Sequence, residues 1–237
     1  VNSAKDDAAG LAISERMNAQ VRGMNVAIRN ANDAISLSQT AEGALGKVGD
    51  MLQRMRELAV QSANATNGTS DRANLNAEYQ ALGTEVVRTL ANTKFNGLAI
   101  LGANAGTLSF QVGANAGETV DVVTTRLDTA GSITGATGGA ITDATLAGTA
   151  MTNIDTALTA VNGERALYGA TQNRFDAIIG TLQVAAENQA AAKSRITDAD
   201  FAAETANLSR AQILQQAGSA MVAQANQLPQ AVLALLR

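Results

Sequence analysis

The residues of this chain that could carry out chemistry are carboxylates, because the 237-residue sequence contains no histidine and no cysteine. Two pairs stand out, Asp6 with Asp7 and Asp198 with Asp200, since neighbouring carboxylates can hold a divalent cation or act as a general acid and base. Each pair also stands at the start of a stretch with helical periodicity, where a carboxylate accepts backbone N–H groups and is stabilised by the helix dipole. We therefore interpret both pairs as helix caps, and expect no catalytic, cofactor-binding or metal-binding residues.

The composition excludes several classes of function. Without histidine and cysteine, the chain can build neither the Ser-His-Asp or Cys-His catalytic sites nor the usual zinc sites, so we predict that it is not an enzyme. A net charge of -4 with only four lysines argues against a nucleic-acid-binding protein, which needs a basic face. No stretch approaches 18 uninterrupted apolar residues, which predicts that the chain has no membrane span.

The high alanine content favours long helices that pack closely. The sequence has 49 alanines, one proline and only 3% aromatic residues. Alanine is the best helix former, and its small side chain lets two helix backbones approach each other. The chain is therefore expected to pack helices tightly rather than to build a thick core of large side chains.

A first long helix is predicted over residues 4–64. Ser3 is its expected N-cap, with Asp6 reaching back to close a capping box. At 1.5 Å per residue such a helix is about 90 Å long, which predicts an elongated rod. Three glycines, each costing about 1 kcal/mol in a helix interior, mark a possible kink: Gly43, Gly46 and Gly49.

Three more helices are predicted by the periodicity of apolar residues. The second, about 71–93, is expected to run back antiparallel to the first after a turn at 66–69. The third begins near residue 152, and a break at 194–196 separates it from a last helix over about 200–236.

A small β-region lies between the second and third helices. Strands are predicted at 98–101, 107–112 and 119–123, and the glycines between the last two indicate a hairpin turn. Residues 126–150 are rich in Gly, Ala and Thr, and we expect a short, variable surface loop there. Its many hydroxyl groups leave glycan binding or modification as a less favoured alternative.

Apolar residues repeat every three and four positions on the first and third helices, as in a coiled-coil seam. The seam runs through Leu45, Val48, Leu52 and Met55 on the first helix, and through Phe175, Ile178 and Leu182 on the third. We expect the two helices to lie side by side and to bury these residues, which we call the rod seam.

The last helix is nearly free of charge, since Arg210 is the only charged residue between Glu204 and Arg237. A helix this apolar needs burial on most of its sides, so we predict that it serves assembly rather than an ordinary core. The expected assembly residues are Phe201, Leu208, Ile213, Leu214, Met221, Val222, Leu233 and Leu236.

The predicted fold is mainly α, an elongated rod of long antiparallel helices in a coiled-coil-like bundle, with a small β-hairpin region. Residues 1–125 are expected to supply the N-terminal helices and the hairpin, and residues 126–150 the surface segment. Residues 151–197 form the C-terminal helix of the same rod, and residues 198–237 the assembly helix.

Several long motifs, in the same order along almost the whole chain, resemble bacterial flagellins. They are NSAKDDAAGLAI at 2–13, QRMRELAVQSAN at 53–64, FNG at 95–97, FQVGAN at 110–115, DADFA at 198–202, LSRAQILQQA at 208–217 and LLR at 235–237. The sequence departs from the family in two ways. The further N-terminal helical arm of the family is missing before Val1, and the middle region is shortened to about 126–150. Because that arm would pair with the last helix, we expect the chain as given to polymerise poorly.

The resemblance implies a structural subunit that is exported unfolded by the flagellar type III apparatus and polymerises into the flagellar filament for swimming. The implied partners are other flagellin subunits, an export chaperone, and filament cap or junction proteins. The implied location is secreted, in the flagellum at the bacterial cell surface. A secreted or cell-surface adhesin or receptor ligand built on the same rod is the alternative.

One surface patch follows from the resemblance. Arg54, Leu58 and Glu85 match positions that Toll-like receptor 5 contacts in the flagellins it detects. An arginine beside an exposed leucine suits a binding anchor, and the same surface would be buried between subunits of a filament. The alternative is that Arg54, Arg56 and Glu57 form an ordinary solvated face.

Overall fold

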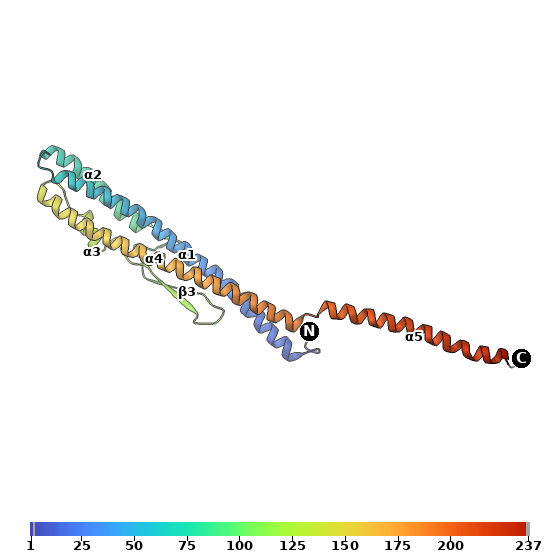
Figure 1. The fold of residues 1–237 in the computed structure, drawn as a ribbon. Coiled ribbons are helices and arrows are strands. Elements are labelled where there is room, and N and C mark those ends of the chain that lie inside the picture. Colours follow the sequence, from blue (N-terminus) through green and yellow to red (C-terminus); the bar gives the residue numbers. More distant parts are fainter. Residues whose placement is uncertain (2, 236–237) are drawn as a thin grey trace. The chain divides into compact units, whose positions relative to one another are not determined.

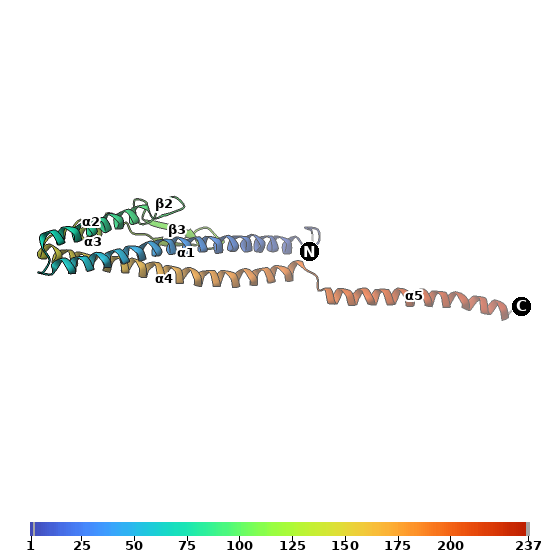
Figure 2. The same cartoon turned by 90° about the horizontal axis from the view of Figure 1, so that it is seen from above.

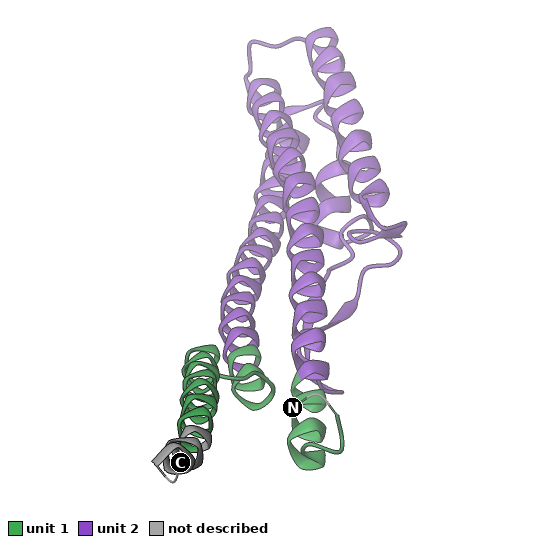
Figure 3. Ribbon diagram, turned by 90° about the vertical axis from the view of Figure 1, so that its right-hand side faces the viewer, with its two compact units in different colours: residues 1–17, 190–237 green, residues 18–189 purple. Residues whose placement is uncertain are grey.

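A computed structural model shows a mainly helical chain with two small antiparallel strand pairs (Figure 1). It describes residue 1 and residues 3–235, with side chains as far as Ala225. The chain divides into two compact units, Asn18–Gln189 and Val1–Met17 together with Ala190–Arg237 (Figure 3). Among the described residues, no helix is long and apolar enough to cross a membrane.

The larger unit contains α2 (Thr69–Asn92) and most of α1 (Ala8–Ala63) and α4 (Ala144–Thr197), and within it these three long helices lie side by side (Figures 1 and 2). α1 alone has 56 residues, which is about 84 Å at 1.5 Å per residue. It runs without a break through the three glycines that the sequence marked as a possible kink. The predicted fold of long antiparallel helices with a small β-region is confirmed.

Side-chain hydrogen bonds show that α1 and α4 run antiparallel. They also determine which residues of the two helices lie opposite each other. Gln189 donates to Gln20, Gln172 donates to Glu42, and Arg56 donates to Asp155. Residue numbers rise along α1 as they fall along α4. Leu52 and Met55 therefore lie level with the part of α4 near Asp155, which is separated from Phe175 by about five turns of the helix.

Most of the rod seam is buried. Its four residues on α1 and Phe175 on α4 are fully buried, while Ile178 and Leu182 are half-buried. The ring of Phe175 meets that of Phe110 from the hairpin edge-to-face, with centroids 6.0 Å apart. Alanine is frequent among the other buried residues, at Ala27, Ala31, Ala34, Ala41, Ala147, Ala150 and Ala157.

Two short antiparallel strand pairs follow α2. β1 (Lys94–Phe95) pairs with β2 (Leu98–Ala99), and the sequence predicted only the second of these strands. The turn between them has positive φ at Asn96 and Gly97, which suits the Asn-Gly pair of a two-residue hairpin. β3 (Thr107–Gln111) and β4 (Thr119–Val123) form the predicted longer hairpin, with Ser109 opposite Asp121.

The tip of the longer hairpin is held against α1. Asn30 Nδ2 donates to the carbonyl of Gln111 at 3.0 Å. Gly23 of α1 faces Ala114 so closely that a Cβ on Gly23 would lie 2.8 Å from the Ala114 Cβ. Glu118 closes the tip internally by accepting from the backbone N–H of Asn115 at 2.9 Å.

The prediction that residues 126–150 form a surface loop is wrong. They include helix α3 (Gly131–Thr137), whose Ile133 and Ala136 are fully buried, and Ile141 beyond it is buried as well. Gly83 of α2 lies against the backbone of Thr137, where a Cβ would come within 2.9 Å of the carbonyl oxygen. The Gly, Ala and Thr residues that suggested a loop instead permit a close approach of α3 to α2.

Several helix ends differ from the prediction. α1 begins at Ala8 rather than residue 4, because Asp7 caps it, accepting from the N–H groups of Ala9 and Gly10 at 3.0 and 2.9 Å. Ser3 is not the N-cap, and its N–H donates to Asp6 in the preceding turn. α4 begins eight residues earlier than predicted, where Asp143 accepts from the N–H of Leu146.

We predict that Phe175→Ala lowers the free energy of unfolding by about 3–5 kcal/mol, because the surrounding alanines cannot fill the space left behind. Phe201→Ala is the matched control, since the same truncation on a side chain that is 82% exposed should cost less than about 0.5 kcal/mol. Thermal unfolding of the two variants measures both. Equal melting temperatures would contradict the burial of Phe175.

A second prediction concerns two glycines of the same helix. Gly23→Ala should push the hairpin tip away from α1 and destabilise the chain, because its Cβ would overlap Ala114. Gly43→Ala should stabilise it by up to about 1 kcal/mol, because nothing lies within 4 Å of the new Cβ. Denaturant unfolding should show a lower free energy of unfolding for Gly23→Ala and a higher one for Gly43→Ala. Stabilisation by both substitutions would mean that the tip does not pack on Gly23.

Candidate functional site

A charged face covers neighbouring parts of α1 and α2. It comprises Arg54, Glu57, Glu78, Glu85 and Arg88. Arg54 Nε donates to Glu78 Oε1 at 2.9 Å, and Arg54 Nη1 donates to Glu57 Oε2 at 3.0 Å. Glu78 and Glu85 are two turns apart on the same side of α2, so Glu85 and its partner Arg88 continue this face.

Hydrogen bonds between these opposite charges shift their pKa values. The bond from Arg88 lowers the pKa of the Glu85 carboxyl, and the bonds to Glu78 and Glu57 raise the pKa of Arg54. The pairs are well exposed, with about half of the Arg54 side chain accessible to solvent. Exposed ion pairs contribute little to stability. Breaking these pairs to contact a partner would therefore cost little free energy of folding.

Leu58 does not belong to this face, and the prediction that it is exposed beside Arg54 is wrong. Leu58 is fully buried. One turn further along α1, the Ser62 hydroxyl donates to the carbonyl of Ile141, so the segment before α4 passes over this side of α1. Leu58 is therefore part of the core, covered by the same segment that the sequence suggested to be a loop.

Val60, which the sequence reasoning missed, is the apolar residue that α1 exposes here. It is 50% exposed, and with Gln53, Arg56, Glu57 and Gln61 it lines a shallow hollow of about 460 Å³. Val60 lies outside the three- and four-residue spacing of the rod seam, and this could have identified it from the sequence as an exposed residue.

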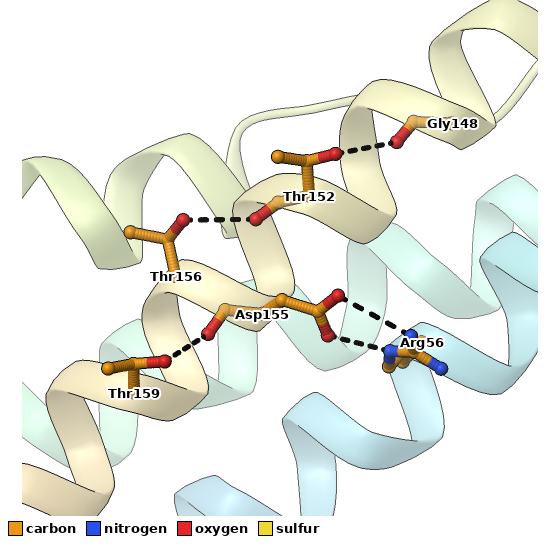
Figure 4. Close-up of polar contacts among 6 residues, drawn as sticks. All are labelled: Arg56, Gly148, Thr152, Asp155, Thr156 and Thr159. Atoms are coloured by element: carbon orange, nitrogen blue, oxygen red, sulfur yellow. Dashed lines mark hydrogen bonds and ion pairs between the residues drawn. The ribbon is translucent and has the colours of Figure 1, made fainter.

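An ion pair across α1 and α4 borders this hollow. Arg56 Nε donates to Asp155 Oδ1 at 2.7 Å, and the bond from Arg56 lowers the pKa of Asp155 (Figure 4). Threonines follow it along α4, and the hydroxyls of Thr152, Thr156 and Thr159 each donate to the carbonyl four residues earlier (Figure 4). These exposed hydroxyl hydrogens are already satisfied within their own helix.

Helix α5 (Phe201–Leu235) belongs to the smaller unit, and every described side chain on it, from Phe201 to Ala225, is exposed. Six of the predicted assembly residues are between 59% and 82% exposed, namely Phe201, Leu208, Ile213, Leu214, Met221 and Val222. The predictions for Leu233 and Leu236 lie outside the described side chains. Phe201 and Leu208 share one side of the helix and Leu214 and Met221 another, so apolar groups emerge in more than one direction.

The aspartates that could have formed a catalytic or metal site are engaged in local structure. Asp200 caps α5 by accepting from the N–H groups of Ala202 and Ala203 at 3.0 and 3.2 Å. Asp198 accepts from the hydroxyls of Ser194 and Thr197, and the bond from Ser194 is the main reason that its pKa is lowered. Asp7 and Asp200 therefore act as helix caps, as the sequence predicted.

Comparisons with protein families match both ends of the chain. Residues 1–105 match the bacterial flagellin N-terminal helical region, and residues 151–236 match the bacterial flagellin C-terminal helical region. The chain belongs to the bacterial flagellin family. Flagellins are structural proteins that polymerise into the filament of the bacterial flagellum, so this chain is a filament subunit and not an enzyme.

Individual flagellins support this assignment over the full length. The chain is 51% identical to flagellin of Halalkalibacterium halodurans over 237 residues, covering all of this chain and 87% of that protein. It is 36% identical to flagellin D of Vibrio anguillarum, with 100% and 90% coverage. The crystal structure of Bacillus cereus flagellin superposes with a TM-score of 0.58 at 34% identity, covering 70% of this chain and 94% of that chain.

The stability of this flagellin should depend on pH through the Arg56–Asp155 ion pair. Because the folded-state pKa of Asp155 is lowered, its contribution to stability is present above the ordinary value of 3.8 and is lost as the pH falls through the lower folded value. We expect Asp155→Asn to destabilise the chain at neutral pH, and the difference from wild type to shrink in acid. Thermal unfolding from pH 7 down to acid tests this.

The control is the same substitution in an Arg56→Met background. There the effect of Asp155→Asn should be small at every pH, since the bond that lowers the pKa is gone. An equally large effect with and without Arg56 would mean that Asp155 contributes through other neighbours.

Proposed function

We propose that α5 and the charged face are the two surfaces through which this filament subunit is incorporated into a flagellar filament used for swimming. α5 is the apolar surface, which needs neighbours to cover it. The charged face, with Arg54 and Glu85, is a polar surface on the folded bundle that becomes an intersubunit contact. The protein would accordingly be secreted and would reside at the bacterial cell surface.

The observation that carries the proposal is the exposure of α5. Large apolar side chains emerge from more than one side of it, and among Phe201–Ala225 only Glu204 and Arg210 carry a charge. Monomeric proteins seldom expose a continuous apolar surface of this kind, and such surfaces usually mark contact sites. A single neighbouring helix would cover one side only, so several copies packed around α5 suit it better than a single partner.

Export of the chain in an unfolded state is consistent with its composition. It has no cysteine that could mispair between compartments, and no Trp. An export chaperone would have to cover the same apolar residues of α5 before assembly, because a segment this apolar is prone to aggregate. Filament cap and junction proteins would meet this surface at the two ends of a filament.

Recognition by Toll-like receptor 5 is a further proposal for the charged face. Arg54 and Glu85 are accessible on it, whereas the buried Leu58 cannot contact a receptor without local unfolding. The exposed Val60 and its hollow are the apolar feature of α1 that a partner could use instead. Because a polymer would cover this face, only the free subunit would be recognised.

We predict that Leu214→Asp abolishes filaments, because a charge placed among the apolar residues of α5 cannot be buried between subunits. Gln215→Asp is the matched control, since Gln215 is an exposed polar neighbour on the same helix. Each variant replaces the wild-type copy in the source bacterium, and filaments and swimming are scored by electron microscopy and motility assays.

The expected result is a loss of filaments and swimming with Leu214→Asp, while the purified protein keeps the wild-type melting temperature. Normal filaments with Leu214→Asp would contradict the assembly role of α5. Loss of surface attachment with motility and filaments intact would instead favour the adhesin alternative.

A further inference from the structure

Three buried polar atoms on α4 have no hydrogen-bonding partner among the described residues, namely the hydroxyl oxygen of Tyr168, Oε2 of Glu164 and Oε1 of Gln189, and the first two belong to residues one turn apart. The Tyr168 side chain is only 1% exposed. Tyr79, the other tyrosine of the chain, is as deeply buried, but its hydroxyl donates to the carbonyl of Ala136. A buried polar group without a partner costs about 1–3 kcal/mol, so the Tyr168 hydroxyl is expected to have one.

The two side chains are chemically complementary and are neighbours on the same helix. Glu164 and Tyr168 are one turn apart on α4, and a long helical side chain leans toward the N-terminus, which directs the Tyr168 hydroxyl toward Glu164. Burial is the main cause that raises the pKa of Tyr168, and the negative charge of Glu164 raises it further. The phenol can donate a hydrogen bond, and the carboxylate oxygen can accept one.

The neighbourhood of this pair is polar, since Gln172 Nε2 donates to Glu42 Oε2 at 3.0 Å and ties this part of α4 to α1. A buried water molecule needs at least two polar partners, and the Tyr168 hydroxyl and Glu164 Oε2 supply two.

We propose that Tyr168 and Glu164 bind one buried water molecule at the α1–α4 seam. The Tyr168 hydroxyl donates to the water oxygen, and the water donates to Glu164 Oε2. Together with the Gln172–Glu42 bond, this water completes a polar layer across a seam that is otherwise built of alanine and aliphatic residues. Such a layer favours one register of α4 against α1, since a shifted helix would leave its polar groups without partners.

The test uses the fact that the chain has only two tyrosines. Tyr79→Phe leaves Tyr168 as the single tyrosine, and its isotope-labelled ring can be examined by NMR for an Overhauser effect from a long-lived water. We expect such a water signal at the Tyr168 ring. Tyr168→Phe is the matched control, and the remaining Tyr79, whose hydroxyl is bonded to a carbonyl, should give none.

Glu164→Leu decides whether the carboxylate is the second partner. The water signal at Tyr168 should disappear in this variant, and Glu164→Gln, which keeps an acceptor oxygen, should retain it. If Tyr79→Phe does not fold, the same spectra are recorded on the wild-type chain and assigned by comparison with Tyr168→Phe. No water signal at Tyr168 in the folded protein, or a signal that survives Glu164→Leu, would overturn the proposal.

Discussion

The lateral packing of α1 along α4 through their side chains is the constraint on which the rest of this structure depends. Alanine is frequent on the buried faces of both helices, for example at Ala31, Ala34, Ala147 and Ala150, so each large side chain carries an unusual share of the packing. Where the buried face is alanine, packing specifies register poorly, because a helix shifted by one turn would meet much the same surface. Polar bridges such as Arg56–Asp155 and Glu42–Gln172 supply that information, because they pair only at one register.

The bundle and α5 differ in how far their apolar side chains are covered. Within Asn18–Gln189, the buried apolar residues of α1, α2, α3, α4 and the hairpin form one hydrophobic core, so this unit has a core of its own. Helix α5 is not complete in this sense, because its described apolar side chains are all exposed. An isolated helix draws little stability from its own backbone hydrogen bonds and depends on packing. In the proposed function, contacts with neighbouring subunits would supply that packing.

Much of the fold and part of the site could be predicted from the sequence. The three- and four-residue spacing located the rod seam, because a buried helix face repeats at that period whatever its partner is. The charge-poor C-terminal helix was recognisable for the same reason, and Asp7 and Asp200 as caps follow from local chemistry.

What the sequence could not supply depends on contacts between distant segments. The burial of Leu58 and Ile141 arises where one segment crosses another, and neither residue carries a local signal of it. The small residues around Gly135 suit a loop and a tightly packed short helix equally well. The level of Phe175 relative to α1 is set by bridges whose partners lie more than a hundred residues apart, such as Glu42 and Gln172.

Hydrogen exchange of subunits taken from native filaments, measured before and after they repolymerise, tests the central claim most directly. That claim is that the bundle folds alone, whereas α5 is buried only by other subunits. The amides of Leu45–Met55 should be protected in both states, because the seam is complete in the monomer. The amides of Phe201–Ala225 should exchange rapidly in the monomer and become strongly protected in the filament. Strong protection of α5 in the monomer, or no gain on polymerisation, would contradict the account.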